Sequence, residues 1–406
     1  MNIIYIAYSC NPYNGSEDKI GWNVPIENAK NNKVYIITKE EHRDSIQKYI
    51  HTNKIEDITI YFVDIPKVYK IFKGCMYSIR LNIWNKRAFK LAREICQSNK
   101  IDIIHQITPI ELRSIGNYGN IDNVEYVVGP IGGGEYVPKS LADYTRNNKH
   151  IEFIRKVANL YYKVKMRITK KMKKTTILYA NEETRDYFNA SKESILLPEI
   201  GIKEEDIIKS KSNDSKSNKC VFLVMGRIVY RKGHNFLLDV LENIPEKYDY
   251  EVRIVGNGKE LINLEKRINN SVILKRHVVI RGACAFNEID KEYDIVDALI
   301  MPSIRETTGT VILESMSRGV PVITINRFGG KNIVNDENGY LYDVDTKEEI
   351  RENLKNVIIR CIENRDELKE KGLIAINDVK KFLWKDKIKQ YNEIYAEILK
   401  KKRSQV

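Results

Sequence analysis

The stretch Ala298-Leu-Ile-Met-Pro302-Ser-Ile-Arg-Glu306-Thr-Thr-Gly309-Thr-Val-Ile-Leu-Glu314 decides how the carboxyl half of this chain folds. It opens with a short apolar run, which is typical of a buried strand. After Gly309 the residues predict a helix that stops at Gly319, because glycine commonly ends helices. Val320–Ile325 is then expected to be the next strand. This order puts Glu306 in a loop at the carboxyl end of a strand and Glu314 one to two turns into the helix.

The loop between the two carboxylates is a candidate anion site. A helix that begins near Gly309 and Thr310 leaves the backbone N–H groups of its first turn unpaired, and such groups attract anions. Their field contributes about 0.3–2 kcal/mol. An anion flanked by two carboxylates that accept hydroxyl hydrogen bonds fits a sugar nucleotide. From this stretch alone, a loop glutamate followed by a solvated helix glutamate remains an equal alternative.

A basic motif follows an earlier apolar run. Gly226-Arg227-Ile-Val-Tyr-Arg231-Lys232-Gly233 comes directly after the predicted strand Val221–Met225. The guanidinium of Arg227 and the ammonium of Lys232 are suited to phosphate groups, the first as a fork and the second as a point charge. The alternative is a solvated basic turn, which is common in a chain with 68 Lys and Arg. Arg231 is interpreted as the residue that faces solvent.

These motifs, with Gly256, Arg281-Gly282 and Asp297, resemble those of the retaining family-four glycosyltransferases of GT-B architecture. Their order and spacing match from Cys220 to Val344, and Phe382-Leu-Trp384 is similar to the start of that family's closing helix. The resemblance implies that Arg227 and Lys232 bind the donor phosphates. It also implies that Glu306 supports the transferred sugar and its positive anomeric centre, and it assigns further donor contacts to Arg281, Thr308, Gly309, Thr310 and Glu314. Thr308 stands where the family usually has Phe.

Two loops of the amino half resemble those of bacterial capsular and exopolysaccharide glycosyltransferases. Asn11-Pro-Tyr-Asn-Gly15-Ser-Glu17 implies a donor contact at Gly15. Gly129-Pro-Ile-Gly132-Gly133-Gly134-Glu135 implies acceptor contacts at Gly133, Gly134 and Glu135, although Glu135 reads equally well as a solvated residue. His105, at the end of a predicted strand, is the remaining acceptor candidate, and a structural role for it is as probable as a functional one.

Apolar runs alternate with helical patterns through both halves, which predicts parallel sheets covered by helices on both faces. We expect an α/β protein of GT-B type: two Rossmann-like, doubly wound domains facing a cleft. The predicted divisions are an acceptor-binding domain (1–200), a linker (201–219), a nucleotide-sugar-binding domain (220–380) and a C-terminal helix that returns to the first domain (381–406). Predicted strands lie at Ile3–Ala7, Val34–Thr38, Ile58–Val63, Ile101–His105, Val124–Val128, Thr176–Ala180, Ile195–Leu197, Val221–Met225, Val252–Val255, Val278–Ile280, Ala298–Met301 and Val320–Ile325.

Composition narrows the class of protein. The chain has 406 residues, a net charge of +13 and six scattered cysteines without a C-x-x-C pair. No run reaches the roughly 18 apolar residues of a membrane span. A cytoplasmic protein with no disulfide, metal or cofactor is expected. The positive charge predicts an anionic partner, but no nucleic-acid-binding signature is present. The G-x-G-x-x-G fingerprint is absent after the first strand, which argues against a nicotinamide enzyme.

Residues 150–174 have apolar side chains at spacings of three and four, with Lys and Arg on the opposite face. Such a basic amphipathic helix is expected at an anionic membrane surface, which would make the protein peripheral on the inner face of the membrane. An ordinary packed helix with a basic outer face fits the pattern equally well.

The sequence therefore predicts a glycosyltransferase that moves a sugar from a nucleoside-diphosphate donor to a glycan or lipid-linked acceptor with retention, in surface polysaccharide biosynthesis. Retention and independence of metal follow from the resemblance. The alternatives are a sugar-nucleotide epimerase of the same fold and a non-catalytic carbohydrate- or membrane-binding protein.

Overall fold

A computed structural model describes residues 1–55, 58–66, 68, 77–168, 175–192, 194–208, 219–284 and 288–404. The chain forms two compact units. Unit 1 comprises Met1–Gly134, Lys156–Gly201 and Trp384–Val406, and unit 2 comprises Glu135–Arg155 and Ile202–Leu383. In this division Glu135–Arg155 cluster with unit 2, as do Ile202–Ile208 and Lys219 of the predicted linker. Residues 209–218 of that linker lie outside the described residues.

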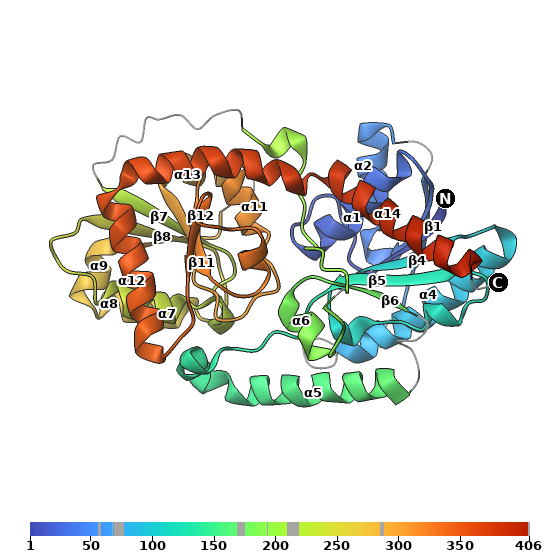
Figure 1. The fold of residues 1–406 in the computed structure, drawn as a ribbon, viewed down its shortest axis with the longest axis horizontal. Helices are drawn as coiled ribbons and strands as arrows, with labels where there is room; N and C mark the ends of the chain where they lie inside the picture. The colour runs from blue at the N-terminus through green and yellow to red at the C-terminus, as the bar shows by residue number, and fades with distance from the viewer. Residues whose placement is uncertain are drawn as a thin grey trace. The chain divides into compact units, whose positions relative to one another are not determined.

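Unit 1 contains a six-stranded parallel sheet with strand order β3-β2-β1-β4-β5-β6 (Figure 1). Strands β1 and β4 are almost wholly buried because helices cover both faces, so their residues are apolar on both sides. The segment predicted as a strand at Ile195–Leu197 makes only an isolated bridge, between Tyr179 and Leu196. The strands are β1 (Asn2–Ala7), β2 (Lys33–Lys39), β3 (Ile58–Val63), β4 (Ile103–Thr108), β5 (Glu125–Ile131) and β6 (Thr176–Tyr179).

The C-terminal helix completes unit 1. This helix, α14 (Trp384–Arg403), packs against α1 (Glu17–Ala29), and its Tyr391 and Tyr395 are fully buried. The predicted return of the C-terminal helix to the first domain is thereby confirmed. The other helices that contribute to this unit are α2 (Arg43–Asn53), α4 (Tyr77–Ser98), α6 (Glu182–Tyr187) and the greater part of α5 (Lys149–Ile168).

Unit 2 repeats this architecture with strand order β12-β11-β10-β7-β8-β9, again all parallel. One of its strands, β12 at Gly339–Tyr342, was not expected from the sequence. The strands are β7 (Cys220–Met225), β8 (Tyr250–Val255), β9 (Val278–Gly282), β10 (Ala298–Met301), β11 (Val322–Ile325) and β12. The helices around them are α7 (His234–Leu241), α8 (Leu261–Asn269), α9 (Val272–His277), α10 (Ile289–Asp294), α11 (Val311–Met316), α12 (Lys347–Glu363) and α13 (Arg365–Asp378) (Figure 1).

Both sheets change direction at a defined point. In each, the first strand of the unit lies between its second and fourth strands, so the chain order reverses between β1 and β4 in unit 1 and between β7 and β10 in unit 2. Ligands of doubly wound sheets bind outside the carboxyl ends of the strands at such a switch point. The topology therefore favours a ligand site at the loops after β1 and β4 in unit 1 and at the loops after β7 and β10 in unit 2.

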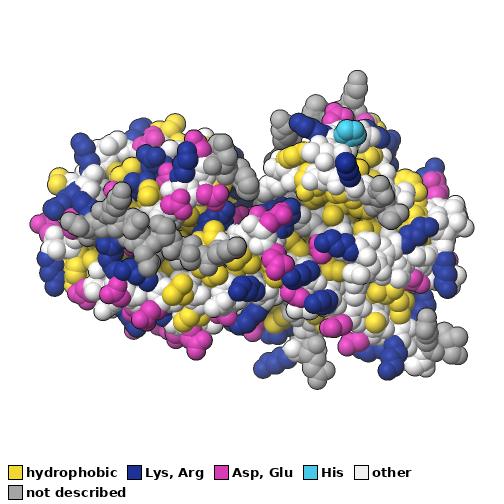
Figure 2. Space-filling view, turned by 90° about the horizontal axis from the view of Figure 1, so that it is seen from above, with side chains coloured by type: hydrophobic (Ala, Val, Ile, Leu, Met, Phe, Trp, Pro, Cys, Tyr) yellow, Lys and Arg dark blue, Asp and Glu magenta, His cyan; other side chains and the backbone are white. Residues whose placement is uncertain are grey.

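None of the helices in the described ranges combines the length and the apolar run that a bilayer crossing requires. On the face of the molecule shown in Figure 2, Lys and Arg side chains are interspersed with Asp and Glu side chains. The positive net charge is therefore not gathered into one patch on that face.

Candidate functional site

The loops that follow β7 and β10 lie against each other in unit 2. The carbonyl oxygen of Arg231 accepts hydrogen bonds from the backbone N–H groups of Ile304 (3.0 Å) and Arg305 (3.3 Å). Gly233 ends the short helical turn Tyr230–Lys232 with φ 73°, a conformation that favours glycine. A Cβ atom added there would lie 1.9 Å from the carbonyl oxygen of Pro302. Close backbone contact thus brings the basic motif to the loop that carries Glu306.

An ionised cluster forms where these loops meet. Nη1 of Arg231 donates to both carboxylate oxygens of Glu306 at 3.2 Å, and Nζ of Lys232 donates to Oε2. The Glu306 side chain is only 11% exposed. Burial opposes its ionisation, but the charges of Lys232 and Arg231 and their hydrogen bonds outweigh burial and lower the pKa of Glu306 to about 2. Glu306 is therefore a carboxylate at any physiological pH.

The interpretation of Arg231 as a solvent-facing residue is wrong. Its guanidinium is largely covered and shares Glu306 with Lys232. The spacing of the basic motif did not reveal this contact, because the partner lies 75 residues further along the chain. Its role depends on the meeting of two loops, which is a property of the fold.

A second polar network supports the same loops and was not predicted. Glu152, near the start of α5, accepts hydrogen bonds from the Tyr230 hydroxyl (2.6 Å) and from Nη2 of Arg305 (3.0 Å). Tyr230 precedes Arg231, and Arg305 precedes Glu306, so this carboxylate holds the residues adjacent to both members of the ion cluster. The adjacency of Arg305 to Glu306 was the only sequence signal for it.

The start of α11 completes the site on the β10 side. Gly309 has φ 98°, and a Cβ atom there would approach the sulfur of Met301 to 3.0 Å. Thr308 is fully buried, and Thr310 occupies the N-cap position of the helix. Glu314 lies in the first turn and is partly exposed. The predicted loop-to-helix transition after the strand is thus present, with a six-residue helix.

The two remaining basic candidates of unit 2 differ from each other. Arg227 follows β7 and is exposed, and its side chain makes no ion pair with any carboxylate in the described ranges. Arg281, in β9, donates from Nε to Glu292 at 3.2 Å, and Glu292 also pairs with Arg253. Arg227 is therefore available to an anionic ligand, whereas the Arg281 guanidinium is already paired with a carboxylate.

The glycine-rich segment after β5 is held by its own chain. The carbonyl of Gly133 accepts from Nδ2 of Asn159 (2.8 Å), and the N–H of Gly134 donates to the Thr184 hydroxyl (3.2 Å). Glu135 is only 2% exposed, and Arg155 donates to both its carbonyl and its carboxylate. The alternative of a solvated Glu135 is therefore wrong.

His105 and Gly15, both in unit 1, occupy opposite environments. Gly15 lies in an exposed turn before α1. The His105 ring is fully buried, with Nδ1 2.6 Å from the Tyr395 hydroxyl and Nε2 2.7 Å from the carbonyl oxygen of Gly129. Because a carbonyl only accepts, Nε2 carries the proton and Nδ1 accepts from Tyr395. Burial lowers the pKa of His105 to about 4, with the Gly129 bond opposing this. In this geometry His105 links the sheet to α14 and presents no surface to an acceptor.

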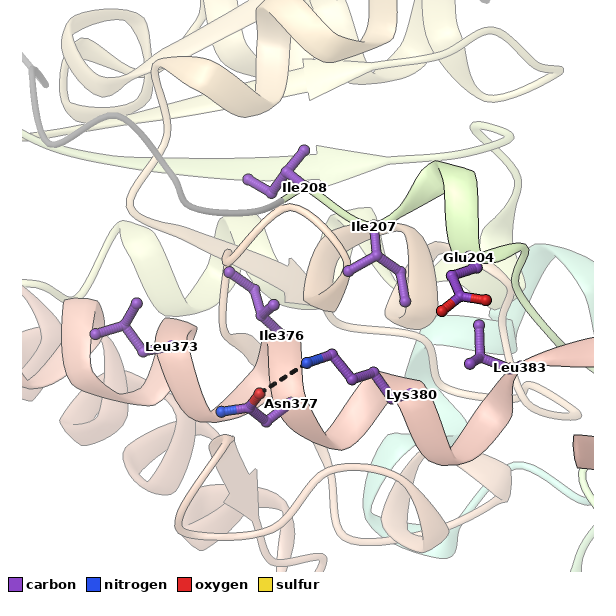
Figure 3. Close-up of a pocket in the computed structure, with 8 residues that line it drawn as sticks. All are labelled: Glu204, Ile207, Ile208, Leu373, Ile376, Asn377, Lys380 and Leu383. Atoms are coloured by element: carbon purple, nitrogen blue, oxygen red, sulfur yellow. Dashed lines mark hydrogen bonds between the residues drawn. The ribbon is translucent and has the colours of Figure 1, made fainter.

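A cavity of about 410 Å³ lies elsewhere in unit 2 (Figure 3). It is bounded on one side by Glu204, Ile207 and Ile208 and on the other by residues of α13 and its continuation. None of the residues around Glu306 lines it. The cavity is therefore separate from the ion cluster. The part of the chain that the structure describes contains no grouping of His, Cys, Asp and Glu able to hold a metal ion.

The ion cluster lies in the part of the chain that matches a known protein family. The sequence model of the family described as "Glycosyl transferases group 1" matches residues 205–373, which include the loops after β7 and β10. An uncharacterised glycosyltransferase of Methanocaldococcus jannaschii is 27% identical over 43% of this chain and 48% of its own length. The lipopolysaccharide core biosynthesis glycosyltransferase LpsE of Rhizobium meliloti is 29% identical over 36% of this chain and 41% of its own length. The chain thus matches less than half the length of these curated relatives.

Solved structures match over nearly the whole chain. The crystal structure of Anabaena HepE in complex with UDP-glucose has a TM-score of 0.63 and 17% identity, and the match covers 99% of this chain and all of that one. At this identity the likeness establishes the fold. The two Rossmann-like sheets and the returning C-terminal helix are those of the GT-B architecture, as the sequence predicted.

Proposed function

We propose that this chain, whose residues 205–373 match the group 1 glycosyltransferases, transfers a sugar from a nucleoside diphosphate to a glycan or lipid-linked acceptor with retention of configuration. The observation that carries the proposal is Glu306, an ionised carboxylate between Arg231 and Lys232 at the switch point of unit 2. A cation pair and a carboxylate side by side suit a ligand that has both phosphate and hydroxyl groups.

Transfer breaks the bond between the anomeric carbon and the diphosphate oxygen, so negative charge builds on the leaving diphosphate and positive charge on the sugar. Lys232 and Arg231, together with the exposed Arg227, stabilise the negative charge on the leaving diphosphate. Glu306 stabilises the positive charge on the sugar and accepts hydrogen bonds from the sugar hydroxyls. Glu314 accepts from the ribose hydroxyls. The acceptor oxygen bonds to the anomeric carbon on the face that the diphosphate leaves, and the proton of the acceptor hydroxyl passes to the departing diphosphate oxygen.

The ion cluster explains how the site can exist without its ligand. Lys232 and Arg231 compensate the charge of Glu306 while no donor is present, so the buried carboxylate never lacks a partner. When a diphosphate arrives, the same two cations can turn to it, and the sugar hydroxyls replace them at Glu306. The first donors to test are uridine diphosphate sugars, since a protein of the same fold was crystallised with UDP-glucose.

The acceptor class follows from the relatives and from the loops of the amino half. LpsE acts in lipopolysaccharide core biosynthesis by its name, and the Gly15 and Gly133–Glu135 loops resemble those of capsular glycosyltransferases. We therefore propose a growing surface polysaccharide, free or lipid-linked, as the acceptor. Gly133 remains the proposed acceptor contact, whereas Gly134 and Glu135 are buried and hydrogen-bonded to Thr184 and Arg155.

A thermal-shift screen of sugar nucleotides tests the donor proposal. A bound donor stabilises the protein by about 2.7 kcal/mol at a hundredfold excess over Kd. We expect a rise in Tm with at least one uridine, guanosine, adenosine or thymidine diphosphate sugar, and loss of that rise in Lys232→Ala. A protein whose Tm is unmoved by every one of them would contradict the proposal.

Incubation with the stabilising donor, with and without a lipid-linked glycan acceptor, separates transfer from its alternatives. Transfer predicts that the donor is consumed only with acceptor and that the new linkage keeps the donor's anomeric configuration by NMR. Epimerised donor in the absence of acceptor would instead indicate the epimerase. Binding of donor without turnover under either condition would indicate a non-catalytic protein.

A further inference from the structure

Helix α5 carries most of its apolar side chains outward, whereas Met166 is buried and Tyr162 packs half-buried against the core of unit 1. The sequence left open whether the apolar face of this helix packs against the protein core or is exposed at the surface. In the structure, side chains on successive turns of one face are between 42% and 67% exposed: Ile151, Phe153, Ile154, Val157, Leu160, Tyr161 and Val164. Single exposed apolar residues are normal on a protein surface, but a continuous apolar stripe marks an interaction surface.

The opposite face of α5 fixes this orientation through polar contacts. Glu152, Arg155 and Asn159 are buried. They bond to Tyr230, to Glu135 and to the carbonyl of Gly133, respectively. An ordinary surface helix buries its apolar stripe and exposes its polar one. Here three hydrogen-bonded polar side chains hold the reverse arrangement in place.

Basic side chains border the apolar stripe. At 3.6 residues per turn, the exposed Lys149, Lys156 and Arg167 fall along one edge of the stripe, and the exposed Lys165 falls along the other. The only acidic residue of α5 is Glu152, and it is buried. The outward surface of the helix is therefore apolar at its centre and positive at its margins. The basic residues of the predicted helix beyond Ile168 lie outside the described residues.

We propose that α5 docks on an anionic lipid bilayer, with its apolar stripe among the acyl chains and its basic margins at the headgroups. A helix in the membrane interface needs both an apolar face and flanking Lys or Arg, and α5 presents both outward. An apolar groove on a second copy of this basic chain would gain nothing from the positive margins, since both surfaces would carry the same charge. Docking would hold the enzyme beside a lipid-linked acceptor, but the proposal does not depend on the transfer reaction.

Vesicle sedimentation of the full chain tests the apolar stripe. The probe is phosphatidylcholine vesicles with about 30% phosphatidylglycerol, an anionic content that gives the surface a negative potential. The combined substitution Val157→Ser, Leu160→Gln and Val164→Ser should lower partitioning about tenfold or more, because apolar area drives insertion. The matched control is Ile262→Gln, Val272→Ser and Leu373→Gln, which alters apolar residues of unit 2 that are more exposed than those of the stripe variant and should bind as the unaltered protein does.

A second triple variant tests the charged margins. Lys156→Gln, Lys165→Gln and Arg167→Gln should lower partitioning about fivefold per residue at low salt. The difference should vanish near 1 M salt, where the Debye length falls to about 3 Å. Equal sedimentation of the unaltered protein and the stripe variant, or equal binding to vesicles of phosphatidylcholine alone, would overturn the proposal. The proposal would also be overturned if the unaltered protein did not bind vesicles and light scattering showed that it is a dimer which the stripe variant disrupts.

Donor binding separates this inference from the proposed function. The stripe variant should keep the full thermal shift with donor, because none of its positions touches the ion cluster. Vesicle binding by a protein that binds no sugar nucleotide would leave the docking inference standing and remove the transferase. Donor binding without vesicle binding would do the reverse.

Discussion

Units 1 and 2 have the same strand order, yet their switch points have different chemistry. In unit 1, the Thr108 hydroxyl at the end of β4 donates to the Ser9 carbonyl (2.8 Å) and accepts from the Ser9 N–H (3.0 Å), so the loop after β1 is joined to β4 by neutral groups. In unit 2, the equivalent loops bring together Arg231, Lys232 and Glu306. The doubly wound topology decides where a site can form, and side chains decide which ligand it suits.

The largest effect should come from removing a cation of unit 2. Lys232→Ala and Arg227→Ala should each lower turnover by about 10²–10³, which is typical for the loss of one preorganised charge that stabilises a transition state. Steady-state kinetics at saturating donor measures this. Lys369→Ala, which removes an exposed lysine of the same unit, is the matched control. Near-normal turnover in both site variants would show that the phosphates bind elsewhere.

The two carboxylates should respond differently, which sharpens the assignment within unit 2. Glu306→Gln should lower kcat by about a hundredfold with a smaller change in donor Kd, because its charge matters most in the transition state. Glu314→Gln should chiefly weaken donor binding, by about tenfold, through a lost charge-assisted hydrogen bond. Glu337→Gln, an exposed carboxylate of the same unit, should change neither quantity. The opposite pattern would exchange the two roles.

The smallest expected effect is a change in the stability of unit 1 at acidic pH. Burial lowers the pKa of His105 from 6.5 to about 4, so between these values the unfolded chain binds a proton that the folded chain excludes. The contribution of neutral His105 to the free energy of unfolding is therefore fully present above about pH 6.5 and is lost as the pH falls towards 4. His105→Gln should remove about 1–3 kcal/mol of that loss, measured by urea unfolding at several pH values. The exposed His150 offers the control variant His150→Gln, and equal pH dependence in both variants would contradict the assignment.

Much of the fold could be predicted because its signals are local. Apolar runs with helical patterns between them identified eleven of the twelve strands that the described residues form, and Gly309 marked the entry to α11. The strand β12 was missed because it starts with a glycine, directly after a turn rich in Asn and Asp. Length alone does not explain the miss, since the four-residue edge strand β6 was predicted.

The unpredicted parts of the site depend on contacts between distant segments. The pairing of Arg231 with Glu306 and the bridge from Glu152 to Arg305 form only when separate loops meet. The helical period of α5 correctly separated its apolar from its polar residues, but the period does not say which face turns inward. That choice is made by Glu135 and the carbonyl of Gly133, which supply buried partners for Arg155 and Asn159.

The return of α14 to unit 1 has a consequence for how this gene can be recombined. Unit 1 is formed by three separate stretches of the chain, and the last of them, Trp384–Val406, follows the whole of unit 2 in sequence. A chimera that replaces only the first half would set a foreign surface against Tyr391 and Tyr395, whose side chains are fully buried here. Exchange of unit 1 between proteins of this architecture would therefore require α14 to travel with the amino-terminal half.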